Sequence, residues 1–376
     1  MEIDERKTIV IGIKEIQRKK LQFSLIALVI TLISYLVLMI NGLGIGLNKQ
    51  AGSALLGLDA DAIAYSSSSR LSVIRSELPP SVVEEVGRFN GVDASSPLGY
   101  LSVNTKSPDG AIQAVALLGY VPSQLGEPRI IDGELLSEND KRGVLVDAKF
   151  LKSSNLGIGD TLTLVNRLQT YDFTVKGQVS EGYFFFQPVV YLLLDSLREV
   201  KYGENTSETP LASVVLVKGS HLIGTKTTDF EIVSKQTAFA NIEGVEGQQQ
   251  TINALRLFGF LIGAMVVGIF FYVLTLQKTQ QVGTLKALGA SNIFLFRQML
   301  LQVLTIIVIG VIVSAAAAYG TYLLLSRLPQ AVPISFNIET FLITSILFIL
   351  TGLIGLMFSL RKVSKIDPII AINQQQ

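Results

Sequence analysis

The sequence has no cysteine, no tryptophan and one histidine in 376 residues, and only 16% of its residues are charged. Without cysteine there is no disulfide, no thiolate nucleophile and no iron–sulfur cluster. A single histidine cannot build a zinc site of the usual histidine and cysteine kind. The formal net charge of +1 excludes a nucleic-acid binder held by a general basic field, because no excess of cations is there to displace counterions from phosphates.

Several catalytic motifs are absent as well. No G-x-x-x-x-G-K-[S/T] phosphate loop occurs, so the chain cannot cradle ATP phosphates in the usual way. The motifs H-E-x-x-H and G-x-S-x-G are also missing, and the long apolar runs carry no ionisable residue at their centres. Ion-driven carriers normally keep such residues at mid-membrane, so an ion-coupled transporter and an intramembrane protease are both disfavoured.

Apolar residues, which make up 49% of the chain, gather in four charge-free runs of 21 to 29 residues. A bilayer core of about 30 Å requires about 20 helical residues. We therefore predict four transmembrane helices, at residues 21–48, 253–277, 298–326 and 340–360. The first run is much longer than the apolar core of a signal peptide, which favours a retained membrane anchor.

The distribution of cations predicts the orientation. Residues 1–20 hold six Lys and Arg, residues 278–297 hold three and residues 361–376 hold three, whereas the short loop 327–339 holds Arg327 alone. By the positive-inside rule both termini and the middle loop are cytoplasmic, in a multi-pass protein of the cell membrane. Residues 49–252 then lie outside, where 17 Lys and Arg face 24 Asp and Glu. The near-zero net charge conceals two opposite charges separated by a membrane.

The external segment alternates short β-type runs with turn clusters. The runs are at residues 61–65, 101–105, 112–118, 143–146, 161–165, 171–175, 189–194 and 213–217. Residues 81–88 and 195–202 have the mixed spacing of surface helices. The predicted fold is therefore a membrane α-helical protein with a large α+β extracytoplasmic domain, residues 49–252, inserted between transmembrane helices 1 and 2. Residues 1–20 are predicted to form an amphipathic cytoplasmic helix.

A second amphipathic pattern lies in the cytoplasmic segment 278–297. Val282, Leu285 and Leu288 recur at i, i+3 and i+6, and Gly289 is placed as a helix stop. This pattern predicts a short helix that docks into a groove on a partner, although a plain connecting loop is the alternative. Lys286 is interpreted as part of a solvated helix face.

Several motifs agree with one family. The segment Gly283–Ser291 (GTLKALGAS) resembles the stretch after the second span of FtsX-like permeases of ABC transporters, the MacB-type (type VII) architecture. The tail Lys362–Ile372 is similar to that family's ending, and Gly143–Asp147 with Leu156–Leu164 is similar to its external domain. Three further stretches look like the haem-efflux (Hrt-type) permeases of Gram-positive bacteria: residues 234–244, 268–278 and 329–336. Many family members have an acidic residue where Gln281 stands.

This resemblance implies a homodimer of the permease paired with two copies of an ABC ATPase subunit. It implies that residues 279–289 form the coupling helix, that ATP and Mg²⁺ bind only in the partner, and that the chain is not itself an enzyme. No intrinsic cofactor is expected, and the transported substrate would be haem or another amphipathic molecule. The alternatives are an exporter of lipid, peptide or drug, and a mechanotransmission permease that regulates an external partner such as a cell-wall hydrolase.

If the substrate is haem, candidate ligands of the iron are Met39, His221, Glu231 and Glu243, because cysteine is absent. Tyrosines are further candidates. Arg256 is a candidate partner of a haem propionate, with snorkelling as the alternative. Glu231 and Glu243 are expected on a helical stalk above the membrane, and each of these residues has a plain alternative role in packing or on the surface.

Two glycine patterns leave alternatives open. Gly42, Gly44 and Gly46 alternate in the first run, and Gly259 and Gly263 form a G-x-x-x-G spacing in the second. Such glycines let helices approach closely, either within one subunit or across a dimer axis.

Overall fold

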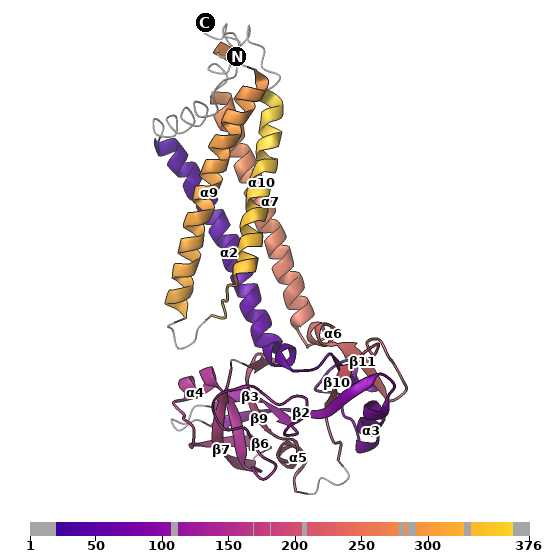
Figure 1. Cartoon of the computed structure of the whole chain (residues 1–376). Coiled ribbons are helices and arrows are strands. Elements are labelled where there is room, and N and C mark those ends of the chain that lie inside the picture. Colours follow the sequence, from indigo (N-terminus) through magenta and orange to yellow (C-terminus); the bar gives the residue numbers. More distant parts are fainter. Residues whose placement is uncertain are drawn as a thin grey trace. The chain divides into compact units, whose positions relative to one another are not determined.

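The structure, a computed structural model, describes residues 20–106, 112–167, 169–180, 182–204, 209–277, 283–284, 291–326 and 332–363. The chain divides into two compact units. The helical unit comprises the residues up to Gly46 and from Gln250 onward, and the sheet unit comprises Leu47–Gln249. Two helices labelled in Figure 1, α2 (Lys20–Gly57) and α7 (Val245–Gln277), each have residues in both units.

The helical unit is built from α2, α7, α9 (Asn292–Leu325) and α10 (Ile338–Val363). Each coincides with one of the charge-free runs, where leucine, isoleucine and valine favour a helix that satisfies its own backbone. Ser291 caps α9, and its hydroxyl accepts a hydrogen bond of 3.2 Å from the backbone N–H of Phe294.

Three stretches are long and apolar enough to cross a membrane: Phe23–Gly57, Val245–Phe270 and Leu300–Leu325. In α10 the corresponding apolar stretch among the described side chains is shorter, Phe341–Leu350. The structure thus supplies three of the four predicted spans by length and composition, and the fourth, at residues 340–360, stays a prediction.

All four helices contribute to one apolar core. Its buried members are Phe23, Ile26 and Ile30 of α2, Val267 of α7, Val303, Ile306, Ile307 and Val311 of α9, and Phe348 of α10. Other apolar side chains point away from this core, among them Leu25, Leu28, Leu32 and Leu36 of α2, each more than half exposed. Such a stripe at helical spacing is suited to contact with lipid or with another apolar helix.

The sheet unit contains eleven named strands among its described residues. They are β1 (Ala62–Ser66), β2 (Val92–Lys106), β3 (Ile112–Tyr120), β4 (Ile130–Gly133), β5 (Gly143–Asp147), β6 (Thr161–Asn166), β7 (Gln169–Val179), β8 (Tyr183–Phe184), β9 (Gln187–Leu193), β10 (Val214–Gly219) and β11 (Phe230–Ser234). The helices are α3 (Pro80–Arg88), α4 (Ala148–Ser154), α5 (Leu194–Tyr202) and α6 (Lys235–Ala240), with a single 3₁₀ turn at Ser67–Ser69. Every predicted β-type run overlaps a strand, and α3 and α5 match the two predicted helices.

Strand β2 is shared by two sheet regions because it is long. Its second half, from Gly99, pairs with β3, and the pairings continue through β9, β5, β7 and β6 back to β2, so six strands close into a ring. Apolar side chains of these strands form a buried cluster that includes Leu117, Phe173 and Val190, each at most 1% exposed. The first half of β2 joins β10, β1 and β11 in an antiparallel sheet that is covered by α3.

Asp147 ties these elements together. Its side chain is fully buried at the end of β5. The Oδ1 atom accepts a 2.9 Å hydrogen bond from Phe150 N and caps α4, while Oδ2 accepts a 2.7 Å bond from Gly182 N, just before β8. A carboxylate with two backbone donors is stable in such a buried place.

We predict that Asp147→Ala lowers the stability of the full-length protein by about 2–4 kcal/mol, because it removes a helix cap and leaves Gly182 N buried without an acceptor. The melting temperature in detergent measures this loss. The control is Asp160→Ala, which removes one exposed bond to Gly157 N and should cost less than about 1 kcal/mol. Equal effects of the two substitutions would contradict the role given to Asp147.

Candidate functional site

Polar contacts within the helical unit converge on α2. The hydroxyl of Ser314 on α9 donates to that of Ser34 at 2.9 Å, and Asn41 Nδ2 donates to Thr344 Oγ1 of α10 at 2.9 Å; all four residues are buried. Tyr35 and Thr321 share a further hydrogen bond of 3.0 Å. Side-chain bonds of this kind join helices where apolar packing alone gives little specificity.

Sequence reasoning missed these residues. The available signal was the spacing of Ser34 and Asn41, which stand seven residues apart inside a charge-free run and so lie on one helix face. The partners on α9 and α10 could not be found from the sequence, since Thr and Ser recur along both helices and only packing selects among them.

The three alternating glycines of α2 face different neighbours in the same chain. A side chain at Gly42 would meet the ring of Phe336, and one at Gly46 would overlap the backbone carbonyl of Pro333. The segment 332–337 also donates a 3.0 Å hydrogen bond from Ser335 N to Gly42 O. Gly42 and Gly46 therefore form a groove for this segment, while Gly44 faces α7.

The glycines of α7 pack in the same way. A Cβ at Gly259 would lie 2.8 Å from Val37 of α2, and one at Gly263 would lie 3.2 Å from the ring of Phe348 on α10. Of the two readings left open by the sequence, packing within one subunit is the one that the structure supports for both glycine patterns.

Arg256 lies on α7 opposite Gly44. Its Nη1 donates to Asn253 Oδ1 at 3.2 Å, and its buried Nε has no hydrogen-bond partner among the described residues. A Cβ at Gly44 would stand 3.0 Å from Nη2, so the glycine makes room for the guanidinium. An arginine inside an apolar span is costly and invites a functional hypothesis.

The five candidate haem contacts belong to two different units of the chain. Met39, half-buried on α2, and Arg256 belong to the helical unit, whereas His221, Glu231 and Glu243 belong to the sheet unit. Two of the five candidates, Met39 and Arg256, thus lie on the helices themselves.

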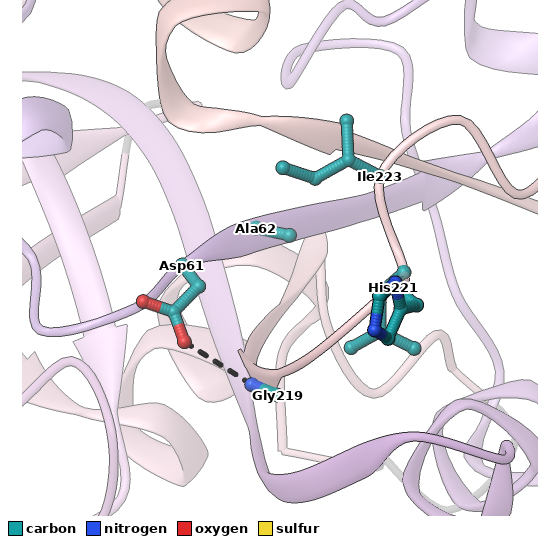
Figure 2. A pocket seen from close by; sticks show the side chains of 6 residues that line it. Asp61, Ala62, Gly219, His221 and Ile223 are labelled. Carbon is teal, nitrogen blue, oxygen red and sulfur yellow. Dashed lines mark hydrogen bonds between the residues drawn. The ribbon is translucent and has the colours of Figure 1, made fainter.

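His221 follows the end of β10, as the sequence indicated. It is exposed, has a positive φ of 59°, and lines an open hollow of about 280 Å³ with Asp61, Ala62, Gly219, Leu222 and Ile223. Figure 2 shows this hollow and the 3.1 Å bond by which Gly219 N donates to Asp61 Oδ2. No group of three or more metal-ligating side chains occurs here or elsewhere among the described residues.

The prediction that Glu231 and Glu243 lie on a helical stalk is wrong. Glu231 lies on β11 opposite Tyr65 of β1, and it forms a 2.8 Å ion pair with Lys226. Glu243 lies between α6 and α7 and accepts a hydrogen bond from the Ser72 hydroxyl. Glu231 is in a strand because residues 230–234 pair with β1. The mixed composition of these residues did not indicate a strand.

Buried tyrosines of the sheet unit are poor ligands for iron. Burial, with a smaller effect of Glu243, raises the pKa of Tyr100 to about 12. Burial likewise raises the pKa of Tyr65, Tyr120 and Tyr191. A tyrosine ligand to haem iron is a phenolate, and burial makes that charged form harder to reach at these positions.

The residues predicted to couple to an ATPase are Val282, Leu285, Lys286, Leu288 and Gly289. All five lie outside the described residues, so their assignment stays a prediction.

Comparison with known proteins identifies the C-terminal region. Residues 248–368, which include α7, α9 and α10, match the family described as FtsX-like permease C-terminal. The chain carries an FtsX-like permease domain. This domain contains Arg256, Gly259 and Gly263 and supplies the partners Ser314 and Thr344 of the α2 contacts.

Relatives of the permease extend over nearly its whole length. A protein of Staphylococcus haemolyticus, provisionally named as the hemin transport system permease HrtB, is 25% identical and covers 96% of this chain and 98% of its own. An uncharacterized ABC transporter permease of Mycobacterium tuberculosis is 22% identical over the same shares.

Solved structures give weaker matches. The periplasmic region of MacB from Actinobacillus actinomycetemcomitans has 17% identity and a TM-score of 0.34, and it covers 50% of this chain and 94% of its own. The extracellular domain of the transporter YknZ from Gram-positive bacteria has 15% identity and a TM-score of 0.32, and it covers 43% and 84%.

We predict that Gly46→Ala destabilises the permease by about 1–3 kcal/mol, because its Cβ would collide with a backbone carbonyl that cannot rotate away. The melting temperature in detergent reports the loss. Gly320→Ala on α9 is the matched control: a Cβ there meets nothing within 4 Å, and alanine favours a helix, so stability should be unchanged or higher. A Gly46→Ala protein as stable as the control would exclude the proposed groove.

Proposed function

We propose that this chain is the permease subunit of an ABC efflux transporter that extrudes haem, or another amphipathic molecule, from the membrane. The observation that carries the proposal is the similarity to staphylococcal proteins named as hemin transport permeases, which covers 96% of this chain and 98% of theirs. With this coverage, the similarity includes both the sheet unit and the helices of this chain.

The energy for transport would come from a separate subunit. The sequence has no phosphate loop, and FtsX-like permease domains are membrane subunits rather than ATPases. We propose two copies of an ABC ATPase, which dock on residues 279–289 through Val282, Leu285 and Leu288. Both termini of the permease would be cytoplasmic, with residues 49–252 outside.

A homodimer would use apolar side chains rather than glycines. Gly42, Gly46 and Gly259 are filled by neighbours in the same chain. The faces left for a second copy are the exposed stripes, such as Leu25–Leu36 of α2 and Leu261–Ile269 of α7. Shape-matched packing of such stripes is what holds helices together in lipid.

Met39 and Arg256 are the candidates best placed for a substrate taken from the membrane. Both belong to the helices, where a planar amphipathic molecule partitions. A thioether can ligate haem iron, and a guanidinium pairs well with a carboxylate. His221 and Glu231 lie in the sheet unit, and Glu231 already has Lys226 as its partner.

We predict that Met39→Ala changes the absorption spectrum of bound haemin and that Arg256→Gln weakens haemin binding about tenfold, as the loss of one charged hydrogen bond would. Haem dimethyl ester, which lacks both carboxylates, should bind equally to the wild type and to Arg256→Gln. His221→Ala is the control and should behave as the wild type. An unchanged spectrum in Met39→Ala would contradict the assignment of Met39 as an iron ligand. If the dimethyl ester binds more weakly than haemin to Arg256→Gln by the same factor as to the wild type, Arg256 is not the partner of the propionates.

Deletion of the gene tests the function itself. Cells without the permease should become sensitive to haemin, because the compound accumulates in their membranes, and expression of the permease together with its ATPase should restore growth. Normal growth of the deletion strain on haemin would instead favour a lipid, peptide or drug as substrate, or the mechanotransmission role.

Coupling to the ATPase gives a separate prediction. Replacing Leu285 and Leu288 by Asp should abolish substrate-stimulated ATP hydrolysis without loss of expression, because two carboxylates would be buried in the docking groove. Lys286→Gln should have little effect, since this residue is interpreted as solvated. Full stimulation in the double aspartate variant would disprove the coupling assignment.

A further inference from the structure

Helix α2 is bent inside the sheet unit. Gly52 departs from helical geometry, with φ −167° and ψ 35°, while the residues on either side remain helical. A break of this kind disturbs the i to i+4 hydrogen bonds around it, so the carbonyl groups just before the break need other donors.

A strained turn supplies those donors. Strands β8 and β9 are joined by Phe185 and Phe186 alone, and both have positive φ, 50° and 62°. Two positive φ values characterise a type I′ hairpin, which normally has Asn-Gly at these positions. Two phenylalanines in this conformation are strained and persist only where their surroundings fix them.

The turn is bonded to the bend. Phe185 N donates to Ala51 O at 2.9 Å, and Phe186 N donates to Gln50 O at 2.8 Å. Next to them, Tyr183 N donates to Ser53 Oγ at 3.0 Å. The two carbonyls immediately before Gly52 are therefore held by the two strained residues.

The other side of the turn is fixed to the sheet. Phe185 packs against Phe184 and Tyr100, with ring centroids 4.6 and 5.3 Å apart. Gly182 N is held by the buried Asp147, and β9 pairs with β3 and β5 in the closed ring. A change in the bend of α2 would thus act directly on a central strand.

A straight α2 and the bonded turn compete for the same two carbonyl groups. In a regular helix Gln50 O and Ala51 O accept from the N–H groups of Ala54 and Leu55, four residues on. Those bonds would weaken the ones from Phe186 and Phe185, and a turn that lost its acceptors could then relax. Two arrangements with different partners for the same carbonyls make a two-state element.

We propose that the Phe185–Phe186 turn is a strained latch that holds α2 bent at Gly52 and that is released when α2 straightens during transport. The release of the latch during transport rests on the proposed transport function. The existence of two alternative arrangements of the turn and α2 does not.

Phe186→Gly tests the latch by tightening it. The substitution keeps the N–H donor, removes the strain of a positive φ, and deletes a ring that is 40% exposed. We expect the amides at positions 185 and 186 to exchange with deuterium about tenfold more slowly in the full-length protein, and haemin efflux to fall by a similar factor. Phe186→Pro, which removes the donor and cannot adopt this φ, should speed exchange at position 185 at least tenfold.

Arg167→Gly is the matched control. Arg167 also has a positive φ, 47°, but lies in the β6–β7 turn, so its substitution relieves the same kind of strain at another place. It should leave efflux and exchange at positions 185 and 186 unchanged. If Phe186→Gly and Arg167→Gly affect efflux equally, the turn is not a latch.

Gly52→Ala gives a test that needs no transport. Alanine favours a continuous helix over glycine, and its Cβ would stand 2.7 Å from Cδ1 of Ile242 and 2.9 Å from Cδ2 of Phe239, so these two side chains must shift slightly. Exchange at positions 185 and 186 should then rise about fivefold in the isolated permease. Unchanged exchange would overturn the proposal, even if haemin efflux is found, whereas faster exchange without any efflux would refute only the transport function.

Discussion

Every carbonyl and N–H group of a long apolar helix needs a hydrogen-bond partner. In α2 this requirement is met partly by groups from other segments, so the helix is bonded both to the sheet unit and to the segment before α10. Along the charge-free run at residues 21–48 the helical geometry of α2 is uninterrupted, as a membrane demands. Where it is interrupted, at Gly52, backbone groups of the β8–β9 turn take over. Ser335 N adds a bond to Gly42 O from the segment that precedes α10. The same helix thus provides contacts for both units of the chain.

The helical unit contains few buried polar side chains, so each of them limits which helices can pack together. Four of the buried ones are paired with one another, Asn41 with Thr344 and Ser34 with Ser314. Arg256 differs, because its Nε is buried without a partner among the described residues. This arginine marks the part of the bundle where Gly44 leaves room for a guanidinium. The glycines shape this part by admitting Phe336, Pro333 and the guanidinium close to α2.

Much of the fold could be predicted because its signals are local. A charge-free run predicts a span regardless of what surrounds it, and the continuous apolar runs at 143–146 and 189–194 are typical of strands buried on both faces. The first half of β2, which contains Asp93, Ser95 and Ser96, has no such pattern and was missed; its pairing with β10 makes it a strand. Glu231 was placed on a helix for the same reason, since only pairing with β1 makes residues 230–234 a strand.

The sequence by itself determined where the apolar helices lie, which chemistries are absent, and which residue types remain to bind a substrate, because these depend on composition and spacing along the chain. Only the tertiary structure decided that the glycines serve packing within one subunit, that the five candidate contacts separate into two units, and that two phenylalanines hold a bent helix. Those outcomes depend on which distant groups meet. The N–H groups of Phe185 and Phe186, which have positive φ, donate to Ala51 O and Gln50 O, and nothing in residues 183–188 alone specifies those partners.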